Sequence, residues 1–528
     1  MHAATLDTHR PERTPAASVA LRGWQRAALL AMLLGSLIGA GCSGLPQDVQ
    51  RPPSWSLRVA EDVPLSRLVQ ASTPPQQAQL SGFRLLADGA DALSTRLALI
   101  HGARSSLDLQ YFLIGADASG EQMLAALHAA AERGVRVRLL LDDLYAGAHE
   151  ARLVSLDRHA MAEVRLFNPL PVRGAALERR LLGSLHEFER INRRMHNKLL
   201  IADGHVALTG GRNIGDDYFM RSTVANFVDL DILATGPVLG ELAELFDRFW
   251  NDDTAYPALS LLPPAIAVVP PVAAKSADVA AADHTAAQIR RGRLELHFAS
   301  ARVFADAPSK ASRADARLQP GEAMAQSLAL MSAARSDVII ASPYFVPGAG
   351  GLALMQQAAA RGVRIAVMTN SLGATDEPLA YRGYRRYRLD MLKMGVRLAE
   401  LSPTHGERPA GAGTPRSSLG RLHAKLAIVD QRWLLVGSLN MDRRSSRLNT
   451  ELALAIDSPA LAGEAAAMLQ RLWSGSNYQL RLGPAEDRIE WLANEGGQLV
   501  VHRREPHADA LGLWGLRLMS LLVPEDLL

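Results

Sequence analysis

The sequence is poor in cysteine and in net charge. Cys42 is the only cysteine among 528 residues, which excludes an internal disulfide and a metal site built from several cysteine ligands. The formal net charge is only +3, whereas a nucleic-acid-binding protein is expected to carry a strong basic excess. We therefore expect no nucleic-acid partner. The length and the hydrophobic content of 48% predict a globular chain with room for two ordinary domains.

The apolar run near the N-terminus is short for a membrane span. It covers Ala27–Ala40, follows Arg22 and Arg26, and ends just before Cys42. This pattern is typical of a bacterial lipoprotein signal, so we expect residues 1–41 to be a signal peptide and Cys42 to be lipidated. An uncleaved anchor and a chance cysteine are the alternatives. The prediction places the protein at the periplasmic side of a membrane in the bacterial cell envelope. Ser43 favours the outer membrane as the location, and the inner membrane is the alternative.

The chain contains an internal repeat. Ser105–Asp143 and Ser336–Ser371 each read as strand, loop, helix, Arg-Gly-Val and strand, which predicts an α/β architecture of two duplicated halves. The expected organisation is a tether and lead-in over 42–79, a first domain over 80–258, an Ala/Pro-rich linker or surface loop over 259–295, a second domain over 296–485, and a C-terminal hairpin and apolar segment over 486–528.

Lysine is scarce, since only five of the 57 basic residues are lysines. Two of these five lie in similar stretches, "HNKLLIAD" from His196 and "HAKLAIVD" from His423, and in both the lysine follows the histidine by two residues. An asparagine follows each histidine by 17 residues. A single histidine on a strand is usually structural, but a duplication in this detail favours a functional site.

Each copy supplies the same set of polar residues. On a strand, His196 and Lys198 share one face, the Asp203-Gly204 pair predicts a tight turn, and two glycines allow the returning chain to approach closely. The candidate site residues of the first copy are His196, Lys198, Asp203, Gly210, Gly211, Asn213 and Asp229. Those of the second copy are His423, Lys425, Asp430, Gly437, Ser438, Asn440 and Glu451.

If the two halves face each other, these residues suit a phosphodiester. One imidazole attacks phosphorus, and the other donates a proton to the departing oxygen. The lysines and asparagines bind the non-bridging oxygens, and Asp229 and Glu451 are candidates for fixing the histidine tautomers. A compact ammonium can follow a changing phosphoryl geometry better than a planar guanidinium, which accounts for lysine at these positions. We expect neither a metal nor a cofactor.

At these residues the chain resembles the phospholipase D superfamily, whose signature is two HxKxxxxD motifs followed by GSxN. The resemblance extends from about Leu80 to Leu480 and is greatest to lipoprotein-type bacterial cardiolipin synthases. It implies two homologous phospholipase D-like domains, each a mixed β-sheet flanked by helices, related by a pseudo-twofold axis with the active site at their interface. Gly211 departs from the motif, because serine is expected there.

The resemblance also implies a reaction. A phosphatidyl group would pass through a phosphohistidine, with His196 favoured as nucleophile, from phosphatidylethanolamine or phosphatidylglycerol to phosphatidylglycerol, giving cardiolipin. The alternatives are a hydrolytic phospholipase D, a phosphodiesterase or nuclease of the same superfamily, and a scaffold lipoprotein without activity. A helper protein is possible, and the oligomeric state is open.

Two further segments bear on contact with lipid. Leu177–Met195 places apolar residues near helical spacing among five arginines, which predicts an amphipathic helix that contacts either a lipid surface or the protein core. Ala510–Pro524 is a second apolar segment, which docks on the core or contacts a membrane. The polar insert His405–Gly420 is expected to form a loop near the second motif.

Overall fold

The computed structural model describes residues 44–57, 61–174, 176–262, 284–312, 320–406, 418–475 and 477–508. The chain divides into Met1–Leu45 and Pro46–Leu528, and every element named below belongs to the second unit. The predicted signal peptide, Cys42 and Ala510–Pro524 lie outside the described residues, as does most of the polar insert. Within the described ranges, no helix has both the length and the apolar character needed to cross a membrane.

The first half of Pro46–Leu528 is built on eight strands in the order β9-β4-β3-β2-β5-β6-β8-β1. Strands β2, β3 and β4 are parallel to one another, and the other pairings are antiparallel. The strands are β1 (Ser81–Leu86), β2 (Ser106–Tyr111), β3 (Arg136–Asp142), β4 (Ala162–Phe167), β5 (Leu199–Ala202), β6 (Val206–Gly210), β8 (Asp231–Thr235) and β9 (Ala255–Pro257).

The second half repeats this order as β18-β13-β12-β11-β15-β16-β17-β10. The strands are β10 (His297–Ala305), β11 (Asp337–Ala341), β12 (Arg364–Asn370), β13 (Arg397–Leu401), β15 (Leu426–Val429), β16 (Trp433–Gly437), β17 (Leu452–Asp457) and β18 (Asn477–Leu482). Strands β1 and β10 pair antiparallel around Gly82 and Phe298, so the two halves form one continuous sheet of 18 strands with the C-terminal hairpin. The predicted α/β fold with a duplicated mixed sheet is confirmed.

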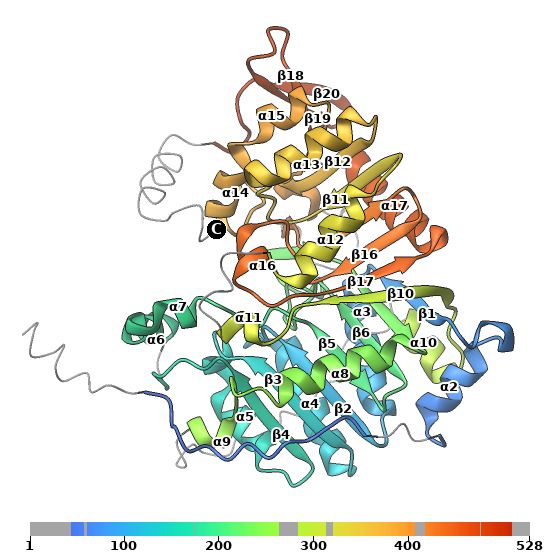
Figure 1. The fold of residues 1–528 in the computed structure, drawn as a ribbon, viewed down its shortest axis with the longest axis vertical. Coiled ribbons are helices and arrows are strands. Elements are labelled where there is room, and N and C mark those ends of the chain that lie inside the picture. The colour runs from blue at the N-terminus through green and yellow to red at the C-terminus, as the bar shows by residue number, and fades with distance from the viewer. Residues whose placement is uncertain are drawn as a thin grey trace, which may run out of the picture. The chain divides into compact units, whose positions relative to one another are not determined.

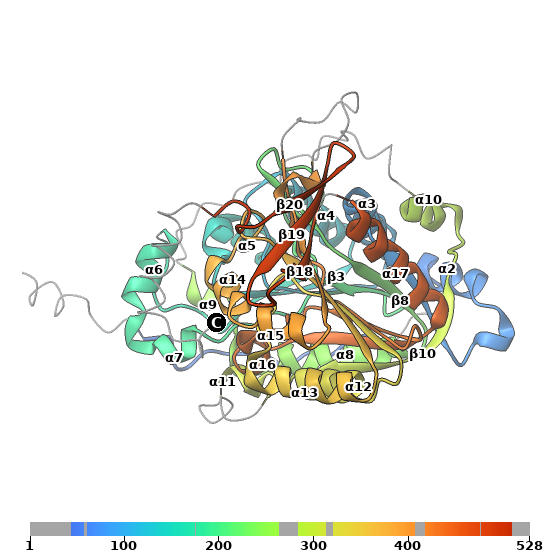
Figure 2. The ribbon, with the colours of Figure 1, turned by 90° about the horizontal axis from the view of Figure 1, so that it is seen from above.

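Helices cover the sheet at equivalent places in the two halves (Figures 1 and 2). The principal ones are α3 (Gly89–Gly102), α4 (Ala118–Glu132) and α8 (Val238–Trp250) in the first half, and α12 (Glu322–Ser332), α13 (Gly348–Ala360) and α17 (Pro459–Ser474) in the second. Helix α8 packs on β10 of the second half, and α17 packs on β1 of the first. Their aromatic ends, Trp250 and Trp473, belong to one hydrophobic core that draws residues from both halves.

The predicted hairpins are present. Asp203 and Gly204 both have positive φ (51° and 70°) and connect β5 to β6, as an Asp-Gly turn requires. Strands β19 (Ile489–Glu495) and β20 (Gln498–His502) pair through a turn at Gly496-Gly497, where the predicted C-terminal hairpin lies.

The Ala/Pro-rich segment 259–295 contains more structure than expected. Residues 263–283 lie outside the described residues, but α10 (His284–Arg291) packs against α3. Both Thr285 N–H and Thr285 Oγ1 donate to the Asp91 carboxylate at 2.8 and 2.7 Å. A long-range polar contact therefore stabilises this helix, and no local hydrophobic period reveals it.

The single amphipathic helix expected over Leu177–Met195 is wrong. The structure has three short pieces, α6 (Leu177–Gly183), η3 (Leu185–Glu187) and α7 (Phe188–Ile191). The buried Arg180 guanidinium bonds the Asp143 carboxylate at 2.6 Å and so holds α6 to the first half. The first helix ends at Ser184, whose hydroxyl donates to Arg180 O.

Candidate active site

His196 and His423 lie just before β5 and β15, in extended backbone that other residues hold in place. The Asp142 carboxylate accepts a bond from Met195 N at 2.8 Å. At the corresponding end of β12, the Asn370 side chain bonds both the N–H and the carbonyl of Leu422, at 2.8 and 2.9 Å. The residue before each histidine is therefore fixed by the last residue of a parallel strand.

Short pairings between the halves bring the remaining groups to the histidines. Strands β7 (Ala225–Val228) and β14 (Leu419–Leu422) form a two-stranded parallel sheet, and His423 N–H donates to Val228 O at 2.8 Å. In the symmetry-related place, Met195 bridges Thr450, and His196 N–H donates to Thr450 O at 3.0 Å. Asp229 and Glu451, which follow Val228 and Thr450, are thereby delivered to the histidine of the opposite half.

Each histidine contacts a buried carboxylate from the other half. His196 Nδ1 lies 3.1 and 3.0 Å from Glu451 Oε1 and Oε2, and His423 Nδ1 lies 2.6 Å from Asp229 Oδ2. An ionised carboxylate can only accept, so a neutral histidine that bonds it carries its proton on Nδ1 and keeps the lone pair of Nε2. Lys425 Nζ also lies 2.9 Å from His423 Nδ1, but the carboxylate contact is the shorter one. Although burial raises the pKa of Asp229, the His423 imidazole lowers it to a net value of about 2, so this carboxylate stays ionised.

The two lysines lie beside the histidines. Lys198 Nζ donates to His196 O at 2.7 Å, and Lys425 Nζ donates to His423 O at 2.6 Å. Burial lowers the pKa of Lys425 to about 8 and that of Lys198 well below its ordinary value. The charge of Lys425 further lowers the pKa of Lys198, so the two ammonium groups are close to each other.

His196 is neutral near neutral pH. Burial lowers its pKa to about 4, and the charges of Lys198 and Lys425 add to this effect against the opposing effect of Glu451. The action of Lys425 on His196 also indicates that the two motifs converge on one site. Two buried ammonium groups beside neutral imidazoles form a binding place for an anion.

At the motif glycines the backbone lies very close to neighbouring atoms. These contacts also explain why glycine replaces the motif serine at position 211. A Cβ on Gly437 would lie 2.1 Å from Leu452 O, and a Cβ on Gly211 would lie 2.1 Å from Asp229 Oδ1. In the second half, the hydroxyl of Ser438, which corresponds to Gly211, donates to Glu451 and accepts from Leu452 N at 3.0 Å. The shorter Asp229 therefore occupies the space that a serine side chain would need.

The motif asparagines are buried close to this site. Asn213 Nδ2 donates to the Tyr218 hydroxyl at 2.9 Å, whereas Asn440 N–H donates to Ser445 Oγ at 3.2 Å. Among the described residues, neither Asn213 Oδ1 nor Asn440 Oδ1 has a hydrogen-bond partner. Both side chains therefore retain hydrogen-bonding capacity.

Asp203 and Asp430, the third residues of the motifs, do not join the histidines. The Asp203 carboxylate accepts from the N–H groups of residues 104–106 at 2.7–3.1 Å. Asp430 accepts from the N–H groups of residues 335–337 at 2.7–3.2 Å. Each aspartate fastens the turn after the motif strand to the start of β2 or β11, which is a structural role.

Several residues near the histidines were missed by sequence reasoning. The rings of Phe112 and Tyr218 pack edge-on against His196 and His423, with centroids 5.2 and 5.0 Å away. Asp142 and Asn370 occupy matching strand ends of the repeat. The repeat therefore contained the signal for Asp142, Asn370 and Phe112, whereas Tyr218 had no repeated counterpart to reveal it.

Comparisons with known proteins agree with this geometry. Residues 97–250 and 328–473 match the family model described as "Cardiolipin synthase, PLD-like domain". The chain is 35% identical over 497 residues to cardiolipin synthase C of Escherichia coli K12, covering 88% of this chain and 100% of that protein. It is 28% identical over 389 residues to cardiolipin synthase A of Pseudomonas fluorescens, covering 73% of this chain and 67% of that protein.

One solved structure shares the fold over most of the chain. The crystal structure of phosphatidylserine synthase from Haemophilus influenzae Rd KW20 aligns with a TM-score of 0.53 at 13% identity, covering 87% of this chain and 96% of the other.

Proposed function

Because the chain belongs to the family of cardiolipin synthases with phospholipase D-like domains and is a phospholipid phosphatidyltransferase, we propose that it forms cardiolipin through a phosphohistidine. The acceptor is phosphatidylglycerol, and the donor is phosphatidylethanolamine or a second phosphatidylglycerol. The observation that carries the mechanism is the crossed arrangement in which each histidine Nδ1 faces a carboxylate of the other half.

The reaction proceeds in two displacements at phosphorus. In the first, Nε2 of one histidine attacks, a P–N bond forms, and the P–O bond to the donor headgroup breaks while the second histidine gives that oxygen a proton. In the second, the acceptor hydroxyl gives its proton to the second histidine, its oxygen attacks phosphorus, and the P–N bond breaks. Lys198 and Lys425 stabilise the charge on the non-bridging oxygens in both transition states.

We assign His196 as the nucleophile. Burial lowers the pKa of both imidazoles, that of His196 to about 4, so His196 is unprotonated at neutral pH, which a nucleophile requires, whereas His423 must take up a proton before it can act as the acid. The Glu451 carboxylate that orients it is itself held by the hydroxyls of Ser438 and Ser445. His423, beside Asp229, is then the proton donor and acceptor.

Exposed apolar residues support the proposal that the protein acts at a membrane surface. Leu182, Leu185 and Phe188 are 67%, 55% and 45% exposed on α6, η3 and α7, next to the first motif. The exposed Arg179 in the same segment suits anionic headgroups, whereas Arg180, Arg193 and Arg194 are buried. Together with a lipidated Cys42, this patch would hold the protein on the periplasmic face of the inner or outer bacterial membrane, with or without a helper protein.

Thin-layer chromatography of lipids tests the proposed reaction. Purified protein is mixed with vesicles of phosphatidylglycerol, with and without phosphatidylethanolamine, beside the His196→Ala and His423→Ala variants. We expect cardiolipin from the wild type alone, and the vesicles that support it identify the donor. Phosphatidic acid in place of cardiolipin would make the protein a hydrolytic phospholipase D, and cleavage of DNA with intact lipids would make it a nuclease.

The same two variants test which histidine is the nucleophile. With a donor labelled in its phosphatidyl group, the His423→Ala protein should slowly gain an acid-labile covalent label, because His196 is still present to attack although the proton transfers of both steps are impaired. The His196→Ala protein should retain none. Label on the His196→Ala protein and not on the His423→Ala protein would reverse the assignment.

A further inference from the structure

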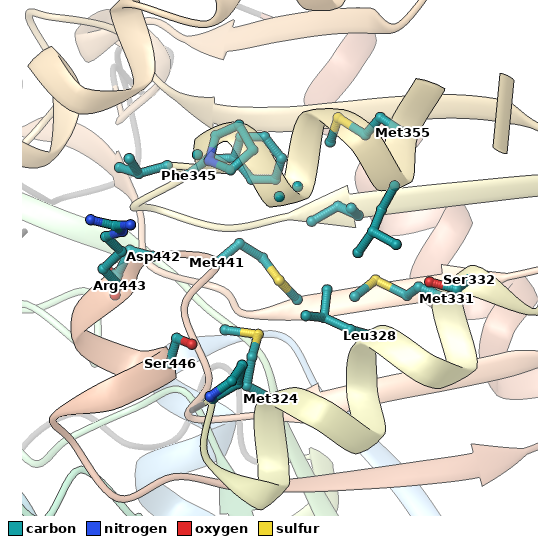
Figure 3. Close-up of a pocket in the computed structure, with 18 of the residues that line it drawn as sticks. Met324, Leu328, Met331, Ser332, Phe345, Met355, Met441, Asp442, Arg443 and Ser446 are labelled. Atoms are coloured by element: carbon teal, nitrogen blue, oxygen red, sulfur yellow. The ribbon is translucent and has the colours of Figure 1, made fainter. Parts of the chain in front are cut away.

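A cavity of about 540 Å³ lies between α12 and α13 of the second half, within the size range of about 300–1,000 Å³ found for ligand pockets. Figure 3 shows its two ends: Asp442, Arg443 and Ser446 lie at one end, and Met331 and Met355 lie toward the other. The charged side chains therefore lie at one end, and the rest of the lining is mostly apolar, with Ser332 beside Met331 at the far end. The apolar walls include Met324, Leu328 and Met331 from α12 and Leu354 and Met355 from α13.

The equivalent place in the first half is filled. There α3 packs against α4, and Leu97 and Met123 are buried in the core of that half. When the two Arg-Gly-Val segments of the repeat are aligned, Met123 of α4 corresponds to Gly351 of α13, and Gly351 lines the cavity. The first half thus has a buried methionine at the position where the second half has a glycine that lines the cavity.

The polar end adjoins the candidate active site. Asp442 follows Asn440 by two residues, and Ser445 joins Asp442 to the active-site Glu451: its N–H donates to Asp442 Oδ1 at 2.7 Å, and its hydroxyl donates to Glu451 Oε1 at 2.6 Å. Arg443 and Arg447 also line the cavity. A phosphate held at Lys425 would thus lie near two arginines at the entrance to an apolar channel.

Resting on the proposed function, we propose that this cavity binds one acyl chain of the phospholipid substrate. The arginines complement the phosphate charge, and the apolar walls accept the methylene groups. Methionine side chains are flexible and can adapt to chains of different length, and Met324, Met331, Met355 and Met441 all line the cavity. The second half would then select lipid over water-soluble phosphodiesters, although both halves share the reactive motif.

Narrowing the cavity tests this proposal. Leu328→Trp and Leu354→Phe fill it from opposite helices, and Leu499→Trp on the exposed C-terminal hairpin is the matched control. Cardiolipin formation is measured in mixed detergent micelles with dipalmitoyl and dihexanoyl phosphatidylglycerol. Because each methylene excluded from an apolar site weakens binding by about fourfold, loss of two methylene contacts should lower kcat/KM for the dipalmitoyl lipid by at least about tenfold.

The short lipid and the control define the outcome. For Leu328→Trp and Leu354→Phe, kcat/KM for dihexanoyl phosphatidylglycerol should stay near the wild-type value, and Leu499→Trp should alter neither lipid. An equal loss with both lipids, or no loss with either, would overturn the proposal.

Deletion of residues 509–528 tests whether the cavity is instead occupied by the chain's own segment Ala510–Pro524. If the deletion and Leu328→Trp both lower the melting temperature while neither changes the ratio between the two lipids, the cavity holds that segment.

A binding experiment tests the acyl site independently of the proposed reaction. If the wild type forms no cardiolipin from any lipid, binding of a phosphatidylglycerol with a pyrene-labelled acyl chain, followed by fluorescence, decides the acyl site by itself. Binding to the wild type that Leu328→Trp weakens and Leu499→Trp does not would support the acyl site. Equal binding to all three proteins would overturn it.

Discussion

Restoring the motif serine in the first half should impair the enzyme. In Gly211→Ser, the new Cβ would lie 2.1 Å from Asp229 Oδ1 and 2.8 Å from Asp229 Cγ, so the carboxylate must move. That carboxylate accepts from Leu230 N at 2.8 Å and lies 2.6 Å from His423 Nδ1. A shift that relieves the clash therefore breaks its contact with His423.

The size of the effect follows from that one lost contact. A hydrogen bond to a charged group contributes about 1.5–3 kcal/mol, which corresponds to a loss of roughly 10- to 150-fold in kcat. The assay is cardiolipin formation from phosphatidylglycerol vesicles, with the melting temperature recorded for each variant. Gly240→Ser is the control, because nothing lies within 4 Å of a Cβ at Gly240, and it should retain wild-type kcat.

A double variant checks the cause. If Gly211→Ser acts by displacing Asp229, then Gly211→Ser combined with Asp229→Ala should be no slower than Asp229→Ala alone. Wild-type activity in Gly211→Ser, or losses in the double variant that multiply, would refute the reasoning.

Three other predictions concern pH, fold and positioning. The mechanism requires neutral His196, protonated His423 and charged Lys425 together. Burial lowers the pKa of His196 to about 4 and also lowers the pKa of His423, so kcat/KM should decline toward about 4 on the acidic side and begin to decline on the basic side below the usual imidazole pKa, with a further loss as pH rises through the Lys425 pKa of about 8; an acidic limb at or above 6.5 would contradict the burial argument. Asp203→Ala should destabilise the fold by about 1–3 kcal/mol, since buried N–H groups lose their acceptor, and Asp430→Ala should cost less, since water can reach the exposed N–H groups that it leaves. The kcat per folded molecule should change little in both variants, and a large loss of kcat with unchanged stability would give these residues a role in the chemistry. Asn370→Ala should lower kcat about tenfold with KM less affected, because the backbone before the second histidine loses two bonds; an unchanged kcat would show that the strand pairing alone positions it.

The sequence by itself determined the duplication and the α/β pattern, and it proposed the histidines, lysines and asparagines of the candidate site. These were readable because strand and helix periods, the Asp-Gly turn and the spacing from histidine to asparagine are local properties of the chain. Because lysine is scarce in this chain, Lys198 and Lys425 stood out among the many arginines. The repeat placed both lysines at the same position of the motif. The local pattern over Leu177–Met195 was misleading, because the burial of Arg180 against Asp143, a distant residue, outweighs the helical spacing.

Only the tertiary structure decided which carboxylate serves which histidine. His196 and Glu451 are 255 residues apart, and His423 and Asp229 are 194 apart. Their pairing depends on how β7 meets β14 and how Met195 meets Thr450. The structure likewise gave Asp203 and Asp430 a structural role and revealed a cavity between α12 and α13 of the second half. Contacts of this kind arise from the packing of whole elements against each other, which no short stretch of sequence specifies.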